Sequence, residues 1–171
     1  MPRQIVHVGR KIRVAIDTET LPDGQIVRRD VILHPGAVVI LPILDAENIV
    51  LLRNHRHAIG ETLWEVPAGT LEPDEPLESA ARRELIEESG YTPAKMTYWG
   101  FLYASPGVLN EKLHIYFAEN LTPGRSSPEP CEQLEPVIVK FADAVKMALN
   151  GEINDAKTIT ALLLWERLRK A

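Results

Sequence analysis

Residues 69–91, GTLEPDEPLESAARRELIEESGY, decide the fold of this chain. Pro73 and Pro76 predict a loop at the start of the stretch. Residues 77–89 predict a helix that ends at Gly90, because glycine readily adopts the left-handed backbone of a helix C-cap. The loop and helix together carry seven carboxylates: Glu72, Asp74, Glu75, Glu78, Glu84, Glu87 and Glu88. Such a density of like charge requires a compensating cation.

Three of these acids share one face of the predicted helix. A helical wheel at about 100° per residue places Glu84, Glu87 and Glu88 on the side that also carries the small apolar residues. Arg83 can pair with Glu87, but one arginine cannot neutralise three acids on a partly buried face. Closely spaced carboxylate oxygens suit a hard divalent cation, Mg²⁺ or Mn²⁺. The alternative is a hydrated helix end with surface Glu–Arg pairs.

The remaining sequence predicts an α+β or layered α/β/α fold. Residues 11–34 alternate as an antiparallel hairpin that turns at LPDG. Further strands are expected in residues 37–44, 49–56, 62–67, 96–105, 112–120 and 136–141, and further helices in residues 142–151 and from Asp155 onward, with Asn154 or Asp155 as the cap. Residues 121–136, LTPGRSSPEPCEQLEP, predict a long loop.

Composition describes one soluble globular domain of ordinary size. The 171 residues are 45% hydrophobic and 25% charged, and the net charge of −5 argues against a nucleic-acid partner. The single cysteine, Cys131, cannot form an internal disulfide. Neither a signal-peptide pattern nor an apolar run of about 18 residues occurs, so we expect no membrane partner and a cytoplasmic location.

The spacing within residues 69–91 resembles the signature of the Nudix hydrolases. That signature reads Gly, five residues, Glu, seven residues, then Arg-Glu-aliphatic-any-Glu-Glu-any-Gly-aliphatic. The matching residues are Gly69, Glu75, Arg83, Glu84, Leu85, Glu87, Glu88 and Gly90, and the one departure is Tyr91 at an aliphatic position. The resemblance implies an α/β/α sandwich with a mixed central sheet and a small N-terminal antiparallel β-sheet. It also implies metal-assisted hydrolysis of a nucleoside diphosphate linked to another group.

The resemblance also implies roles for individual residues. Glu84, Glu87 and Glu88 would coordinate Mg²⁺, with Mn²⁺ as a plausible substitute and the Ala68 carbonyl as a further ligand. Glu87 and Glu88 would thereby belong to the catalytic machinery. The remaining signature residues, Gly69, Glu75, Arg83 and Gly90, would support this structure. For Glu75, direct contact with the metal is the alternative to holding Arg83.

Two stretches outside the signature resemble the ADP-ribose pyrophosphatase branch of the family. SPGVLNE, residues 105–111, would bring Glu111 to the substrate, although Ser-Pro-Gly alone is also typical of a tight turn. Arg56 and Glu65, in RHAIGETLWEVPAG, would help to hold the nucleotide. The alternatives for these two are a surface strand charge and an acid at the edge of the core.

The general base is expected in the long loop. Similarity to the branch favours Glu132, on a loop that closes as a lid. Glu135, three residues later, and Glu111 are alternatives, and a merely solvated acidic loop is another.

The resemblance divides the chain into residues 1–35, a β-hairpin arm through which two copies would form a homodimer, and residues 36–171, the hydrolase domain. The expected reaction converts ADP-ribose to AMP and ribose 5-phosphate. GDP-mannose, another nucleotide sugar or a dinucleotide is the alternative substrate. A noncatalytic nucleotide-sensing module is the alternative of another class, but such a module would be expected to lose signature glutamates.

Overall fold

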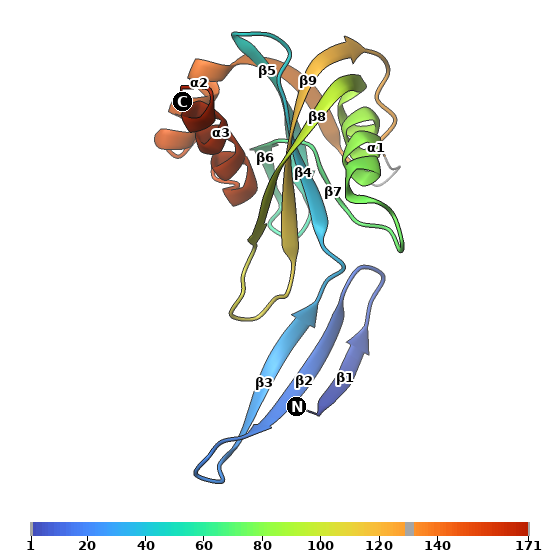
Figure 1. The fold of residues 1–171 in the computed structure, drawn as a ribbon, viewed down its shortest axis with the longest axis vertical. Helices are drawn as coiled ribbons and strands as arrows, with labels where there is room; N and C mark the ends of the chain where they lie inside the picture. The colour runs from blue at the N-terminus through green and yellow to red at the C-terminus, as the bar shows by residue number, and fades with distance from the viewer. Residues whose placement is uncertain (1, 129–131, 171) are drawn as a thin grey trace.

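The computed structural model describes residues 2–128 and 132–170, and its N-terminal part is an arm that projects from the rest of the molecule (Figure 1). Three antiparallel strands in the order β1-β2-β3 form the arm: β1 (Arg3–Val8), β2 (Arg13–Thr20) and β3 (Ile26–Leu33). The hairpin expected at residues 11–34 is confirmed as β2 and β3. Strand β1 is additional. Its six residues are all exposed, and antiparallel pairing with β2 holds it in the sheet.

The body contains two sheets. A four-stranded mixed sheet has the order β7-β4-β9-β8, in which β4 is parallel to β9 and antiparallel to β7. Its strands are β4 (Ala37–Pro42), β7 (Ala68–Thr70), β8 (Tyr91–Tyr103) and β9 (Lys112–Pro123). An antiparallel sheet in the order β10-β5-β6 comprises β5 (Asn48–Arg56), β6 (Glu61–Glu65) and β10 (Leu134–Lys140).

Helices cover the mixed sheet on both faces (Figure 1). Helix α1 (Leu77–Ser89) lies on one side, and α2 (Phe141–Leu149) and α3 (Ala156–Leu168) lie on the other. Because side chains alternate along a strand, β4 supplies both cores. Val38 and Ile40 pack in the core beneath α1, whereas Val39 and Leu41 pack in the core beneath α2 and α3. The expected α/β/α sandwich with a mixed central sheet is confirmed.

Several boundaries show where local sequence signals succeed. Helix α1 ends as predicted, with Gly90 at φ 79° donating its amide hydrogen to the Ile86 carbonyl. Of the two cap candidates, Asp155 caps α3 by accepting a hydrogen bond of 3.0 Å from the Thr158 amide. Strand β10 begins at Leu134, so Glu135 lies in a strand and the prediction of a loop there was wrong.

Cys131 and Glu129 lie outside the described residues. Within residues 2–128 and 132–170, no helix has the length and apolar character needed to cross a membrane.

Candidate active site

The acidic face of α1 packs against strand β7. Glu88 is only 3% exposed, and its Oε2 accepts a hydrogen bond of 2.8 Å from the Ala68 amide. The Glu84 carboxylate lies directly over Gly69, where a Cβ atom would be 1.8 Å from Glu84 Cδ. This close approach explains the glycine at position 69. Strand β7, at the start of the signature, and helix α1, within it, therefore form one unit.

Arg83 connects the acids of the loop and the helix. Its Nε and Nη2 each donate a hydrogen bond of 3.0 Å to Glu75, and its Nη1 donates to Glu84 at 2.8 Å and to Glu87 at 3.1 Å. The structure thus places Glu75 on Arg83, in the supporting position. The Arg83 guanidinium holds the pKa of Glu75 below its usual range.

Two acids of α1, Glu88 and Glu84, are costly to ionise. Burial raises the pKa of Glu88 to about 8; the Ala68 hydrogen bond opposes this, and the charges of Glu84 and Glu132 add to it. Burial also raises the pKa of Glu84, and the charges of Glu87 and Glu132 act in the same direction. A cation beside these carboxylates would relieve both desolvation and mutual repulsion.

The donor chemistry fits a hard divalent cation, because the candidate ligands are carboxylate and carbonyl oxygens. Among the described residues, no three His, Cys, Asp or Glu side chains already surround one point as a metal site would require. Glu84 and Glu87 each accept a hydrogen bond from Arg83 through one carboxylate oxygen, and Glu88 accepts one from the Ala68 amide.

Arg56 and Glu65 form an anchored pair beside the acids. Arg56 Nε donates to Glu65 Oε1 at 2.7 Å, and Arg56 Nη2 donates to the other carboxylate oxygen. Glu65 is 1% exposed, whereas 43% of the Arg56 side chain is exposed. The Arg56 charge lowers the pKa of Glu88, and the Glu88 charge helps to raise the pKa of Arg56. The guanidinium is thus fixed at one edge, open at the other, and close enough to Glu88 to influence its ionisation.

Lys157, in the first turn of α3, is a member of this site that the sequence did not reveal. Its Nζ donates to Glu65 Oε2 at 2.7 Å and to Asp155 Oδ1 at 2.9 Å. The sequence offered an Asp-x-Lys-Thr helix start, but nothing in it related Lys157 to a strand residue 92 positions earlier.

The structure separates the three candidates for the general base. Glu132 is half-buried, and its charge contributes to the raised pKa values of both Glu84 and Glu88. Glu135 is exposed on β10, opposite Arg53 in the strand register.

Glu111 lies at the junction between body and arm, where its Oε1 is 3.4 Å from His34 Nδ1. The loop before Glu111 is joined to β3, because the Ile32 amide donates to the Val108 carbonyl at 2.8 Å and the Asn110 amide donates to the Ile32 carbonyl at 3.2 Å. The arm therefore sets the position of this loop.

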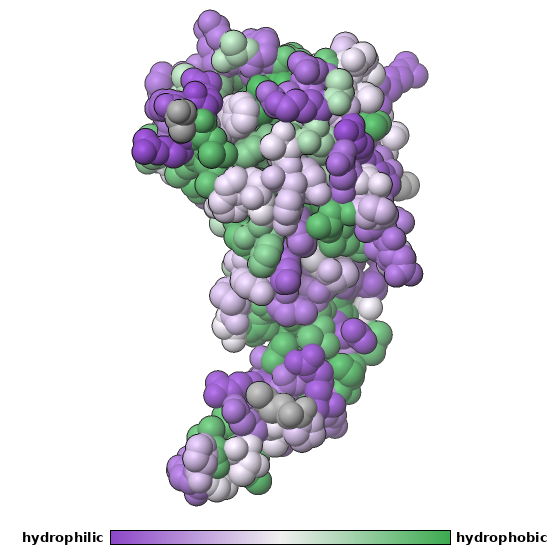
Figure 2. Space-filling view, in the orientation of Figure 1, coloured by the Kyte–Doolittle hydropathy of each residue, from purple (hydrophilic) through white to green (hydrophobic). Residues whose placement is uncertain are grey.

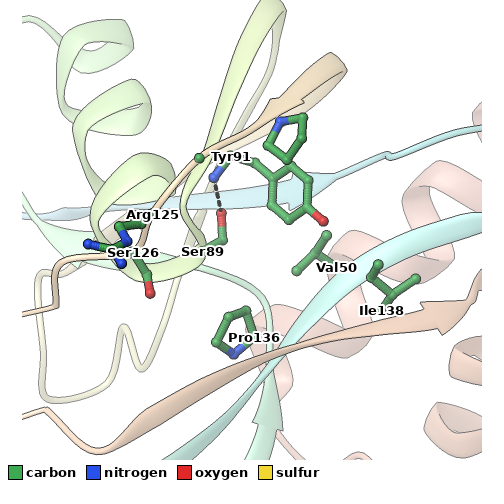
Figure 3. Close-up of a pocket in the computed structure, with 9 residues that line it drawn as sticks. Val50, Ser89, Tyr91, Arg125, Ser126, Pro136 and Ile138 are labelled. Carbon is green, nitrogen blue, oxygen red and sulfur yellow. Dashed lines mark hydrogen bonds between the residues drawn. The ribbon is translucent and has the colours of Figure 1, made fainter.

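A cavity of about 600 Å³ lies at the C-terminal end of α1, beside the segment that follows β9 (Figure 3). It is lined by Val50, Ser89, Tyr91, Pro123, Gly124, Arg125, Ser126, Pro136 and Ile138. Tyr91, the one departure from the signature, forms part of its wall. No predicted site residue lines this cavity, so the acids of α1 and Arg56 define the candidate site instead.

Comparison with known proteins decides the family. The NUDIX domain model matches residues 33–162. The chain belongs to the Nudix family. It is a hydrolase, as its similarity to curated enzymes and to a solved hydrolase structure shows.

Three curated relatives and one solved structure illustrate the similarity of this Nudix hydrolase to known proteins. An ADP-ribose pyrophosphatase of Bacillus subtilis is 35% identical over 162 residues, which span 94% of this chain and 88% of the relative. The methanol dehydrogenase activator of Bacillus methanolicus is 31% identical over 92% of this chain and 86% of the relative. A GDP-mannose pyrophosphatase of Shigella flexneri is 32% identical over 84% of this chain and 81% of the relative. The crystal structure of an ADP compounds hydrolase superposes with a TM-score of 0.83 at 25% identity, covering 99% of this chain and 92% of that one.

Proposed function

We propose that this Nudix hydrolase cleaves the pyrophosphate of ADP-ribose to AMP and ribose 5-phosphate, with Mg²⁺, or Mn²⁺ in its place. The observation that carries the proposal is that Glu65 fixes one edge of the half-exposed Arg56 guanidinium, while Ala68, three residues after Glu65, donates a hydrogen bond to the buried Glu88. An oxygen-rich metal site and an adjacent guanidinium suit a pyrophosphate, because the metal and the guanidinium both bind phosphate oxygens. The named ADP-ribose pyrophosphatase among the relatives supports the choice of substrate.

Glu84, Glu87 and Glu88 would hold the metal, with the Ala68 carbonyl as a further ligand. When bound, a divalent ion neutralises phosphate oxygens and lowers the pKa of a coordinated water. The Glu88 side chain is buried and the Glu84 side chain is 12% exposed, so water reaches this side of the site only in part. Arg56 would bind the phosphates through its exposed edge, because Glu65 occupies the opposite edge.

Glu132 would accept the proton of the attacking water. Its half-buried position and its electrostatic influence on Glu84 and Glu88 support this role. A carboxylate placed beside the metal-binding acids can accept a proton from an attacking water. Glu111 would contact the substrate from the loop that β3 positions.

GDP-mannose is the second candidate substrate, and the relative named for that activity supports it. A noncatalytic sensing module is not favoured, because every charged signature position is filled and the family is that of a hydrolase.

The arm, residues 1–35, would pair two copies into a homodimer, and residues 36–171 would form the catalytic domain. Apolar side chains exposed on the arm support this arrangement, since burying them against a partner would be favourable (Figure 2). The members of this set are Ile5, Val6, Val8, Ile12 and Ile26.

We place the protein in the cytoplasm, without a nucleic-acid or membrane partner.

The decisive experiment incubates the purified chain with nucleotide sugars, dinucleotides and nucleoside triphosphates, with Mg²⁺ and with a chelator, and identifies the products. Metal-dependent release of AMP from ADP-ribose is the expected result. Release of GMP from GDP-mannose with little activity on ADP-ribose would favour the second candidate. If no compound released a nucleoside monophosphate in a metal-dependent way, the proposed function would be wrong.

A further inference from the structure

The buried carboxylate of Glu65 lies between two cations from different parts of the fold. Arg56, at the end of β5, pairs with both carboxylate oxygens, and Lys157, at the start of α3, donates to Oε2 at 2.7 Å. The Lys157 side chain is itself only 12% exposed. Oε2 therefore accepts hydrogen bonds from both Arg56 and Lys157. Because the two cations share this oxygen, a shift of the carboxylate that follows the loss of one would displace the other.

The electrostatics of Glu65 require both partners. Burial alone would raise the pKa of this carboxyl, but the Arg56 hydrogen bond and the charge and hydrogen bond of Lys157 outweigh burial, and the net pKa lies below its usual range. A carboxylate that is 1% exposed is costly to keep ionised with a single partner. Lys157 thus stabilises the ionised form to which Arg56 is bound.

Lys157 is held in place from the other side by the first turn of α3. It donates at 2.9 Å to Asp155, the residue that caps the helix. Thr158 Oγ1 donates to Asp155 Oδ2 at 2.6 Å and accepts a hydrogen bond of 2.9 Å from the Val66 amide. A continuous chain of hydrogen bonds therefore joins α3 to the segment that immediately precedes Ala68.

We propose that Lys157 is a positioning residue that holds Arg56, through Glu65, in the orientation that binds the substrate phosphates. Lys157 does not touch the substrate in this scheme; it fixes the carboxylate that fixes the guanidinium. The inference rests on the proposed role of Arg56. It extends the active site to α3, which the family signature does not include.

The primary test replaces Lys157 by Met, which keeps the length of the side chain and removes its charge. Because Arg56 binds phosphate before and during reaction, loss of its orientation should raise KM for ADP-ribose by about tenfold, the scale of one charged hydrogen bond. The value of kcat should change by less than about threefold, since uniform binding affects KM alone. Lys157→Arg should keep KM close to the wild-type value, because arginine retains a charged donor.

A matched control distinguishes positioning from a general effect of lost charge. Lys146→Met removes an exposed lysine of α2 that pairs with Asp143, and it should leave KM unchanged. A double-mutant cycle with Arg56→Gln adds a second criterion: Lys157→Met should raise KM much less when Arg56 is already absent. Additive effects of the two substitutions on log KM would overturn the proposal, as would an unchanged KM in Lys157→Met.

A second readout is independent of turnover. Hydrogen exchange of the Arg56 Nε proton, followed by NMR, should be slow in the wild type and in Lys157→Arg and at least about tenfold faster in Lys157→Met, because the acceptor carboxylate loses one of its two anchors. Unchanged exchange would overturn the proposal even if the wild type hydrolysed no substrate of the panel. Absence of turnover with accelerated exchange would reject the proposed function and retain the positioning role. Lys157→Gln serves the same comparisons if Lys157→Met does not fold.

Discussion

The Ala68 amide donates a hydrogen bond of 2.8 Å to Glu88 Oε2, and this contact joins β7 to the last turn of α1. It brings the Ala68 backbone and the Glu88 carboxylate to one place, although 20 residues separate them in the chain. The adjoining residue, Gly69, lies beneath Glu84. Backbone and side-chain oxygens that could serve one cation thus belong to a single packed unit.

Gly69→Ala should disable the site while preserving the fold. The added Cβ would lie 1.8 Å from Glu84 Cδ, so the Glu84 carboxylate must move away from β7. We expect kcat to fall by about tenfold or more, and Mn²⁺ affinity, measured by paramagnetic relaxation of water, to weaken. Thermal unfolding provides the control: a loss of more than about 3 kcal/mol would indicate that the substitution acts through stability rather than through Glu84.

The stability of the protein in chelator should fall as pH rises from about 4.5 to about 8. The pKa of Glu88 in the folded state, about 8, is above its ordinary value of 4.5, so the folded state binds more protons than the unfolded state in this window. The stability present below pH 4.5 is therefore lost as pH rises through 8. Denaturant titrations of wild type and Glu88→Gln at several pH values measure the effect. Glu88→Gln should be the more stable form at pH 8.5, by about 2 kcal/mol, and should lack metal-supported turnover.

Equal slopes of unfolding free energy against pH in wild type and Glu88→Gln would contradict this assignment. Saturating Mg²⁺ should flatten the wild-type slope, because cation binding favours the ionised carboxylate and stabilises the folded state by mass action. The same addition should have little effect on the slope of Glu88→Gln.

Glu132→Gln and Glu135→Gln should behave differently. Glu132 influences the ionisation of Glu84 and Glu88, whereas Glu135 is exposed on β10. We expect Glu132→Gln to lower kcat by about 10²-fold or more, the contribution typical of a general base, with metal affinity largely intact. Glu135→Gln should retain wild-type kinetics and serves as the matched control. If Glu132→Gln turned over substrate at the wild-type rate, Glu132 would not be the general base, and Glu111 would be the next candidate.

The arm should determine the oligomeric state. Val8 is 70% exposed, and we expect it to be covered in a dimer. Sedimentation equilibrium at micromolar concentration should give twice the chain mass of 19.1 kDa for the wild type and a lower average mass for Val8→Asp. A monomeric wild type would remove the dimer proposal without affecting the assignment of the acids.

The elements that were predicted well have strong local signals. The nearly continuous β-branched run at residues 37–44 predicted β4, which is buried throughout its length, and Gly90 ended α1 at the expected residue. One strand of the arm was missed. Strand β1 was not predicted although Ile5, Val6 and Val8 favour a strand; all six of its residues are exposed, and pairing with β2 holds it in place.

The sequence by itself determined the acidic face of α1, because the spacing of Glu84, Glu87 and Glu88 follows from helical geometry within a single element. Only the tertiary structure decided which residues those acids meet. Lys157 reaches Glu65 across 92 residues, and Glu111 meets His34 of the segment after β3, because packing α3 and the arm against the body brings these distant positions together. The spacing of apolar and polar residues within one element cannot predict such contacts, because they depend on how separate elements pack around a common core.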